Sequence, residues 1–322
     1  MALSENARGA LLMTGSMGCF VLNDTLMKVA FESVPVAQTL FFRGVFASLM
    51  LIAMAVHTGA IRYKPTRDDV KPFILRAIGE VGATASFMMA LYNMEIANAM
   101  AVLQAAPLAV TVGAALFLGE RVRWRRWSAI GVGFIGMLVI VRPGTEGFDA
   151  YALFAVLSVI FIAIRDLATH EMSRDVPTVF ASVISALLVT VGAGVLIPIE
   201  GWAPMGGSDT LHIFGAGVAI VIGYVTSVSA MRMGEVSAVS PFRYTVLLWA
   251  LLWGFLFFHT LPDAMTFLGA GIVVAAGLYT LWRERSVGQS TATYASNRPF
   301  DGSPPMGQTV IDKPAERPMD SR

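Results

Sequence analysis

Asp24 and Lys28 are the two residues whose types and spacing point most directly to chemistry. They lie four positions apart within the apolar stretch CFVLNDTLMKVAF, residues 19–31. Side chains four apart share one face of a helix, so this carboxylate and ammonium can pair. Inside a bilayer such groups usually face a cavity or a partner. We therefore predict Asp24 and Lys28 as substrate-binding residues, with snorkelling of Lys28 to the lipid headgroups as the alternative.

Arg43 and Glu80 are two further charged residues within apolar stretches. The guanidinium of Arg43 offers a planar fork of donors that suits a carboxylate, a phosphate or an imide carbonyl, so Arg43 is also predicted to bind substrate. A structural ion pair at the membrane rim is its alternative role. Glu80 follows Arg76 by four residues, which favours a salt bridge between them. A buried carboxylate there can also take up and release a proton, which makes Glu80 the candidate for proton coupling.

The stretch SPFRYTVLLWALLWGF, residues 240–255, combines aromatic rings with a cation. Arg243 and Tyr244 lie within it, and Trp249 shares a helical face with Trp253. Such rings can stack on a flat heteroaromatic solute while an arginine donates a hydrogen bond to it. The same aromatic stripe can instead face lipid or pack a core. We predict Arg243, Tyr244 and Trp249 as substrate-binding residues.

The remaining polar residues indicate neither a metal site nor a nucleotide site. The four histidines show no metal-ligand spacing, and Cys19 is the single cysteine. GTEGFD, from residue 144, lacks the lysine and the spacing of a phosphate-binding loop. We therefore expect no metal, no cofactor and no ATP-driven step. An intramembrane enzyme is an alternative class, but it needs catalytic groups that converge at membrane depth, and the sequence suggests no such set.

The elements that carry these residues are apolar stretches. The chain is 56% hydrophobic and only 14% charged, with a mean hydropathy of +0.66, which is typical of an integral membrane protein. A spanning helix needs about 20 mainly apolar residues. Ten stretches of about this length predict an all-α membrane protein, at residues 9–30, 36–56, 73–92, 97–118, 127–141, 149–168, 178–199, 211–231, 237–258 and 263–282.

Lysine and arginine predict how these stretches are oriented. Basic residues cluster in the loops that follow the even-numbered stretches, for example Arg62, Lys64, Arg67 and Lys71. The positive-inside rule therefore places those loops and both termini in the cytoplasm. Residues 286–322 are rich in Ser, Thr, Pro and Gly and cannot bury a core, so we expect a disordered cytoplasmic tail.

The two halves of the chain are related by an offset of 140 residues. ALYNMEIANAMAVLQAAP aligns with AMRMGEVSAVSPFRYTVL, which places Glu95 over Glu235 and Gln104 over Tyr244. Carboxylates favour helix starts, so both glutamates are predicted to stabilise turns. Gln104, as the counterpart of Tyr244, joins the predicted substrate-binding residues. Each half has five spans, an odd number, so the second half is inverted relative to the first, as in many secondary transporters.

Together these features resemble the drug/metabolite transporter superfamily, EamA type. The resemblance rests on the ten stretches in two halves, on LNDTLMK at residues 22–28, on the hairpins at 95–99 and 235–238, and on LGERV, which closes the fourth stretch. It implies inverted repeats at 9–141 and 149–282 that move a small organic solute without ATP. The second half departs from the pattern, because HTLPD stands where a Gly-Glu pair would close the ninth stretch.

The opening stretch and LFFRGVFASLML look most similar to the bacterial branch that includes riboflavin and S-adenosylmethionine uptake proteins. This resemblance implies riboflavin uptake across the inner membrane. Uptake of S-adenosylmethionine and export of amino acids or other metabolites are alternatives on the same fold, and a structural or sensory membrane protein is a third class. The expected partners are a small-molecule substrate and membrane lipid, with a homodimer also considered and no nucleic acid.

Overall fold

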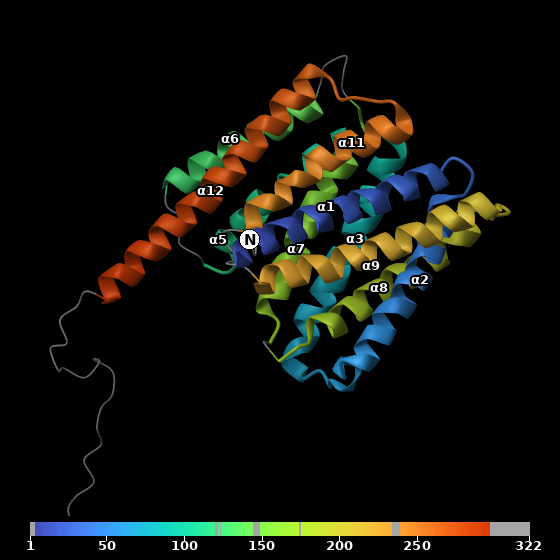
Figure 1. The fold of residues 1–322 in the computed structure, drawn as a ribbon, viewed down its shortest axis with the longest axis horizontal. Helices are drawn as coiled ribbons and strands as arrows, with labels where there is room; N and C mark the ends of the chain where they lie inside the picture. Colours follow the sequence, from blue (N-terminus) through green and yellow to red (C-terminus); the bar gives the residue numbers. More distant parts are fainter. Residues whose placement is uncertain are drawn as a thin grey trace, which may run out of the picture. The chain divides into compact units, whose positions relative to one another are not determined.

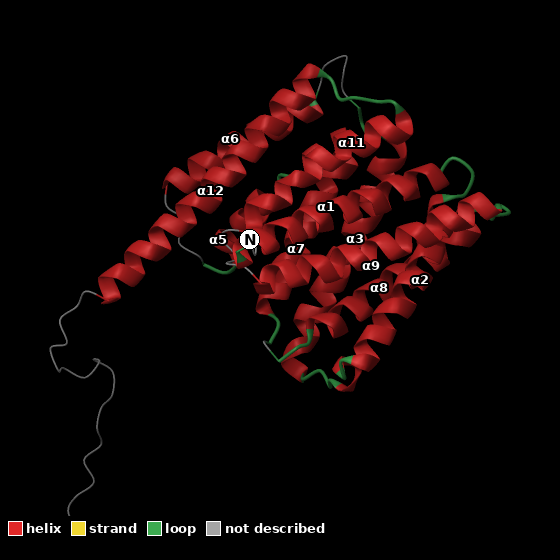
Figure 2. Ribbon diagram, in the orientation of Figure 1, coloured by secondary structure: helices red, strands yellow, loops and turns green. Residues whose placement is uncertain are grey.

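In the described part of the computed structural model, all regular secondary structure is helical. It comprises residues 4–119, 122, 124–143, 149–173, 175–233 and 239–296, and Figure 2 shows helices and loops but no strand within it. Ten of its helical segments are long and apolar enough to cross a membrane. This confirms the prediction of an all-α protein with ten spans.

The first half provides five of these spans. They are formed by α1 (Glu5–Ala30), α2 (Val36–His57), α3 (Arg67–Asn93), α4 (Ile96–Leu103) with α5 (Ala106–Phe117), and α6 (Trp124–Val141), and a short 3-10 helix η1 (Ala60–Arg62) follows α2. Capping side chains set where two of them begin. Ser4 accepts a hydrogen bond from the Ala7 amide at the start of α1, and Thr66 and Asp69 form a capping box at the start of α3. These caps explain why both helices begin before the apolar stretches predicted for them.

The second half provides the other five spans. They are α7 (Ala152–Glu171), α8 (Thr178–Glu200), α9 (Gly207–Met233), the 3-10 helix η2 (Ser240–Thr245) with α11 (Val246–Phe258), and α12 (Ala264–Ser296). The last helix corrects a prediction, because residues 286–296 were assigned to a disordered tail and are helical here. No proline occurs in α12, and the next proline in the chain is Pro299, so no proline ends the helix at residue 285. Residues 297–322 lie outside the described part.

The fourth and ninth spans are both interrupted, at equivalent places. The fourth is broken between α4 and α5 at Gln104, where the amides of Gln104 and Ala105 bond three residues back rather than four. In the described part of the ninth span, η2 is a 3-10 helix that follows Val239 and ends just beyond Tyr244. Pro107 lies just after the first break, and Pro241 lies near the start of η2. A proline has no amide hydrogen to donate to a helical hydrogen bond. The two breaks are therefore 140 residues apart, as the internal offset requires.

Helices of the first half pack mainly against helices of the second. Contacts join α1 to α9, α3 to α7, α2 to α8 and α4 to α11, and Figure 1 shows α1 running between α9 and α11. If each span is replaced by its counterpart in the other half, the α1–α9 contact becomes the α7–α3 contact. The α2–α8 contact becomes itself, as does the contact between the fourth and ninth spans, which α4 and α11 make. Because the halves interlock, Met1–Arg283 forms one compact unit rather than one unit for each half.

Small residues let two of the peripheral spans pack closely. Gly136 on α6 faces Gly269 on α12, and a Cβ added at Gly269 would lie 2.6 Å from the carbonyl oxygen of Gly136. Glycine is therefore required where these backbones meet, as is common between membrane helices.

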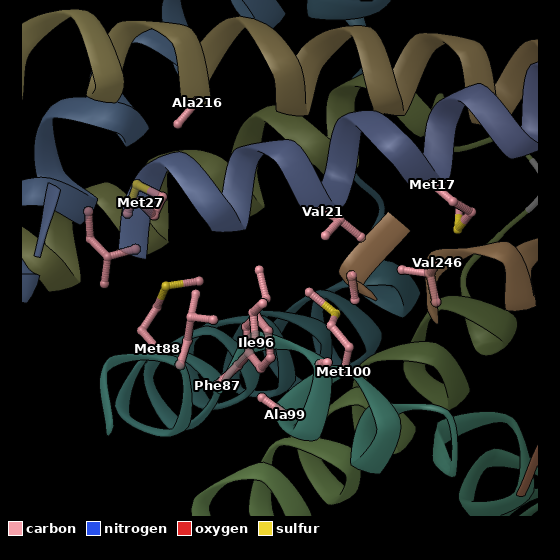
Figure 3. Packing of buried hydrophobic residues seen from close by; sticks show 14 of the residues in the cluster. Met17, Val21, Met27, Phe87, Met88, Ile96, Ala99, Met100, Ala216 and Val246 are labelled. Atoms are coloured by element: carbon pink, nitrogen blue, oxygen red, sulfur yellow. The ribbon is translucent and has the colours of Figure 1, made fainter. Parts of the chain in front are cut away.

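A methionine-rich cluster surrounds the face of α1 that looks toward α3 and α4. Figure 3 shows Met17, Val21 and Met27 of α1 opposite Met88 and Met100, all of them buried. Methionine is flexible and fills irregular gaps, so a core of this kind tolerates rearrangement of the helices around it. Asp24 lies on the same helix, between Val21 and Met27.

Candidate functional site

Asp24, Asn23 and Arg43 form a buried polar group in the last two turns of α1 and the first turns of α2. Asp24, Asn23 and Arg43 keep 9%, 2% and 8% of their residue surface exposed. Asn23 Nδ2 donates to Asp24 Oδ1 at 2.8 Å, and Arg43 Nη1 makes a long contact of 3.5 Å to Asn23 Oδ1. Asn23 therefore connects the carboxylate of α1 to the guanidinium of α2. Two of these residues, Asp24 and Arg43, were predicted from the sequence.

Arg43 and Asp24 do not form a direct ion pair. The ion pairs found among the described residues do not include one between them, although each charge interacts electrostatically with the other. Arg43 Nε is buried and has no hydrogen-bond partner. A buried donor without an acceptor costs about 1–3 kcal/mol, so an acceptor group of a ligand at Arg43 Nε would be favourable.

Glu80 lies in a second charged group, where α3 meets α7. Its carboxylate is 3.8 Å from Arg76 Nη2 on the same helix and 3.8 Å from Arg165 Nη1 on α7. Arg165 Nε also donates to Asp166 Oδ1 at 2.8 Å, and Arg76 donates to Thr169 on α7. The Arg76 salt bridge proposed from spacing is present, and the structure adds a partner from the second half of the chain.

The two charged groups are electrostatically connected. Arg43 interacts with Glu80 as well as with Asp24, so charges of alternating sign run from Asp24 through Arg43 and Glu80 to Arg165. The series joins α1, α2 and α3 of the first half to α7 of the second. A displacement of one helix that moves Glu80 would therefore change the field at the Asp24 group.

Lys28 does not pair with Asp24, although the spacing allowed it. Its ammonium donates to the carbonyl oxygens of Leu91 at 2.5 Å and Met94 at 2.7 Å, at the end of α3, and lies 5.7 Å from the Phe258 ring centre. The last carbonyls of a helix lack intrahelical donors and attract cations. Lys28 therefore caps α3 and ties it to α1, a role that sequence spacing cannot reveal.

Trp249 packs directly on α1. Its indole Nε1 donates to the Thr14 carbonyl oxygen at 2.8 Å, and its ring leaves no room for a side chain at Gly18. Trp253 stacks on it, with ring centres 6.1 Å apart and planes inclined by 18°. The predicted aromatic stripe is present, but Trp249 already uses its polar atom within the protein. The Nε1 of Trp253, a residue not singled out as a site residue, is buried without a partner.

The other predicted site residues are not in contact with the Asp24 group in the structure. Gln104 lies at the α4–α5 break, and Arg243 is exposed in η2. The Tyr244 hydroxyl packs against Gly277 of α12 and is buried without a hydrogen-bond partner. These residues lie at the two helix breaks and not beside Asp24, Asn23 and Arg43.

The two predicted turn glutamates have different outcomes. Glu95 occupies the N-cap position of α4, where its side chain makes no capping hydrogen bond, and its role in stabilising the turn stays a prediction. Its charge interacts with Lys28 instead. Glu235 lies outside the described residues. Within the described residues, no three His, Cys, Asp or Glu side chains gather as metal ligands.

Asn23 is the functional candidate that sequence reasoning missed. A neutral amide in a membrane helix attracts less attention than a charge, although it costs free energy to bury unless it is hydrogen-bonded. The signal was its position beside Asp24 in LNDTLMK. Both polar atoms of its side chain contact a charged neighbour.

Comparison with known proteins adds a family and three relatives. The profile of the EamA-like transporter family matches residues 7–142 and again residues 150–282. The S-adenosylmethionine uptake transporter of Rickettsia felis is 28% identical over 82% of this chain and 88% of its own. The pseudopaline exporter CntI of Pseudomonas aeruginosa is 27% identical, over 86% and 96%. The riboflavin transporter of Rhizobium johnstonii is 28% identical, over 80% and 84%.

Proposed function

The chain belongs to the EamA-like transporter family, and from that premise we propose that it is a secondary transporter that moves a small organic metabolite across the bacterial inner membrane by alternating access. Its ten apolar helical segments make it a multi-pass membrane protein. The single observation that carries the proposal is the Asp24–Asn23–Arg43 group. Charged side chains at this depth need a polar solute, a partner or water to face.

The interlocked halves support alternating access. The family profile matches each half separately, and contacts between the halves keep the same pattern when the halves are exchanged. Inverted repeats allow two equivalent closed ends around one central site, with each end opening in turn. We propose that residues 9–141 and 149–282 are such repeats.

Polar contacts between the halves lie both at the end where α2 begins and at the middle of α3. Near the start of α2, Gln38 exchanges two hydrogen bonds with the backbone of Ala203. On α3, away from that end, Glu80 meets Arg165. In the predicted orientation Gln38 is outside and Glu80 lies toward the cytoplasm. We propose that these contacts break and form in turn as the transporter changes state.

Two substrates deserve the first tests. Riboflavin is the substrate implied by the sequence resemblance, and its flat ring suits the stacked pair of Trp249 and Trp253. S-adenosylmethionine carries charges of both signs, which suits Asp24 and Arg43. Relatives include uptake proteins and an exporter, so the direction depends on the driving gradient in the cell.

Glu80 supports a further proposal about energy coupling. It is partly buried between two arginines on different halves. A proton on its carboxylate would weaken both ion pairs, one of which joins α3 to α7. We propose that Glu80 couples transport to the proton gradient.

Growth and uptake in cells test the proposed function. Bacteria that cannot make riboflavin, and others that cannot make S-adenosylmethionine, would express this protein and be given each labelled solute. Uptake of either one that is lost in Asp24→Asn, at equal membrane abundance, supports the proposal. If neither accumulates, and a broad efflux screen also finds no solute whose movement depends on Asp24, the proposal is contradicted.

A further inference from the structure

We propose that Asn23 is a spacer that keeps Asp24 and Arg43 apart, so that the amino-carboxylate group of a zwitterionic substrate binds between them. The inference rests on the proposed function, and it narrows the substrate to one chemical class. Asn23, Asp24 and Arg43 are all buried, and they come from two adjacent spans.

The first step concerns Asn23. Its amide is neutral and offers both a donor and an acceptor, so it can satisfy a carboxylate and a guanidinium at once. It donates to Asp24 Oδ1 at 2.8 Å and accepts the long contact from Arg43 Nη1 at 3.5 Å. A direct Asp24–Arg43 salt bridge would cancel the two charges. With Asn23 between them, both charges remain available.

The second step concerns the atoms that Asn23 leaves unused. Arg43 Nη1 faces Asn23, while its Nε is buried and unpartnered. On the carboxylate, Oδ1 is occupied by Asn23, and no described residue donates to Oδ2. Nε and the second terminal nitrogen form the side of the guanidinium that binds a carboxylate with two parallel hydrogen bonds. The pair therefore presents one cationic fork and one open carboxylate oxygen.

The third step matches these atoms to a ligand. An α-amino acid group carries a carboxylate and an ammonium a few bonds apart, with no net charge. Its carboxylate suits the Arg43 fork, and its ammonium suits Asp24 Oδ2. A lone anion or a lone cation would leave one buried charge without compensation, which is unfavourable. Riboflavin carries no such group, so this inference favours amino-acid-bearing solutes over riboflavin.

Matched solutes test the inference on the purified full-length protein in detergent. S-adenosylhomocysteine and 5′-methylthioadenosine share the adenosine and the sulfur, but only the first has an amino-carboxylate end. Tryptophan and tryptamine differ by the carboxylate alone. We expect S-adenosylhomocysteine or tryptophan to raise the melting temperature and to bind at least about tenfold more tightly than its truncated counterpart.

Two results would overturn the inference. One is equal binding of each solute and its truncated counterpart. The other is no stabilisation by S-adenosylhomocysteine, tryptophan or any of the other common L-amino acids. Stabilisation by riboflavin and by no amino-acid-bearing solute would be such a result. It would overturn the zwitterion site but would still agree with a transporter. Loss of all transport in the cell assays would instead contradict the proposed function itself.

Variants of Asn23 test its role as a spacer. Asn23→Leu has a similar size but no polar atoms, so Asp24 and Arg43 can approach each other directly. We expect KM for the zwitterion to rise about tenfold with little change in kcat, and the preference over the truncated solute to disappear. Thr25→Val is the matched control, because Thr25 is also buried and bonds only within α1.

A merely structural role for Asn23 would change stability without changing this preference. If Asn23→Leu does not fold, Asn23→Ser keeps a hydroxyl that can donate to Asp24 and accept from Arg43 but has a shorter reach, and should retain part of the preference. An unchanged preference in a folded Asn23 variant would overturn the spacer role.

Discussion

Gly79 on α3 lies directly against the backbone of Arg165 on α7. A Cβ added at Gly79 would be 2.6 Å from the Arg165 nitrogen, closer than such atoms approach in proteins. The absence of a side chain at Gly79 therefore lets α7 come near enough for Arg165 to reach Glu80, the next residue on α3. The position of an ion pair between the halves depends on one glycine.

Gly79→Ala should destabilise the protein and weaken the Glu80–Arg165 contact. Backbone atoms cannot move aside as a flexible side chain can, so we expect a loss of about 1–3 kcal/mol, measured as a lower melting temperature. Gly15→Ala on α1 is the control, because nothing lies within 4 Å of the added Cβ. Equal stability of the two variants would contradict the close packing of α3 against α7.

Glu80→Gln should separate transport from its driving gradient. Without a carboxylate the residue cannot carry a proton or hold Arg165 ionically. We expect exchange of substrate across proteoliposomes to continue, while accumulation driven by a proton gradient is lost. Asp166→Asn removes the more exposed partner of the same arginine and should retain accumulation. Normal gradient-driven accumulation by Glu80→Gln would exclude Glu80 as the coupling residue.

Gln38→Leu should open the end of the molecule where α2 begins. The fully buried amide donates to the Ala203 carbonyl oxygen at 2.8 Å and accepts from its amide at 3.0 Å. Losing both bonds leaves a backbone donor and acceptor unpaired, and we expect a loss of about 1–3 kcal/mol together with greater labelling of a cysteine at position 203. The neighbouring Thr39→Val should change neither, since the Thr39 hydroxyl donates to the carbonyl oxygens of Val34 and Pro35, just before α2, and not to the second half. Unchanged labelling in Gln38→Leu would show that this contact does not hold the end closed.

The Arg142–Asp263 pair should make stability depend on acid. Hydrogen bonds from Arg142 are the main cause that lowers the pKa of Asp263 to about 2. A carboxyl with a lowered folded pKa stabilises the protein above its unfolded pKa, about 4, and that contribution is lost as the pH falls toward 2. The carboxylate is 54% exposed, so the effect is small and screened by salt.

The melting temperature of Asp263→Asn should therefore be slightly lower than that of the wild type at pH 6. The two melting temperatures should become equal near pH 2. Arg142→Gln should produce the same pattern, and added salt should reduce it. A difference between Asp263→Asn and the wild type that grows as the pH falls would have the wrong sign for this pair.

Much of the fold could be predicted from the sequence, because a lipid environment requires long apolar helices. Positions of the ten spans followed from that requirement alone. Helix ends were less predictable, since Ser4 and Thr66 extend α1 and α3 through caps outside the apolar stretches. The length of α12 was missed because composition suggested disorder in a segment that no proline interrupts.

The site was only partly predictable. Asp24 and Arg43 were found because a charge within a membrane span is expensive, and that argument needs no knowledge of the neighbours. Lys28 satisfies the same argument, yet its partners are carbonyl groups at the end of α3, 63 and 66 residues further along the chain. Asn23 was missed because its importance lies in what it separates, which only the arrangement of α1 and α2 reveals.

The measurement that tests the central claim most directly is substrate exchange in proteoliposomes that contain only this protein. Vesicles loaded with unlabelled S-adenosylmethionine or riboflavin are placed in the labelled solute, and the wild type is compared with Asp24→Asn and Arg43→Gln. We predict rapid exchange of one solute by the wild type and loss of that exchange in both variants, with the protein folded in each. Exchange that persists unchanged in both variants would contradict a substrate site at the Asp24–Asn23–Arg43 group.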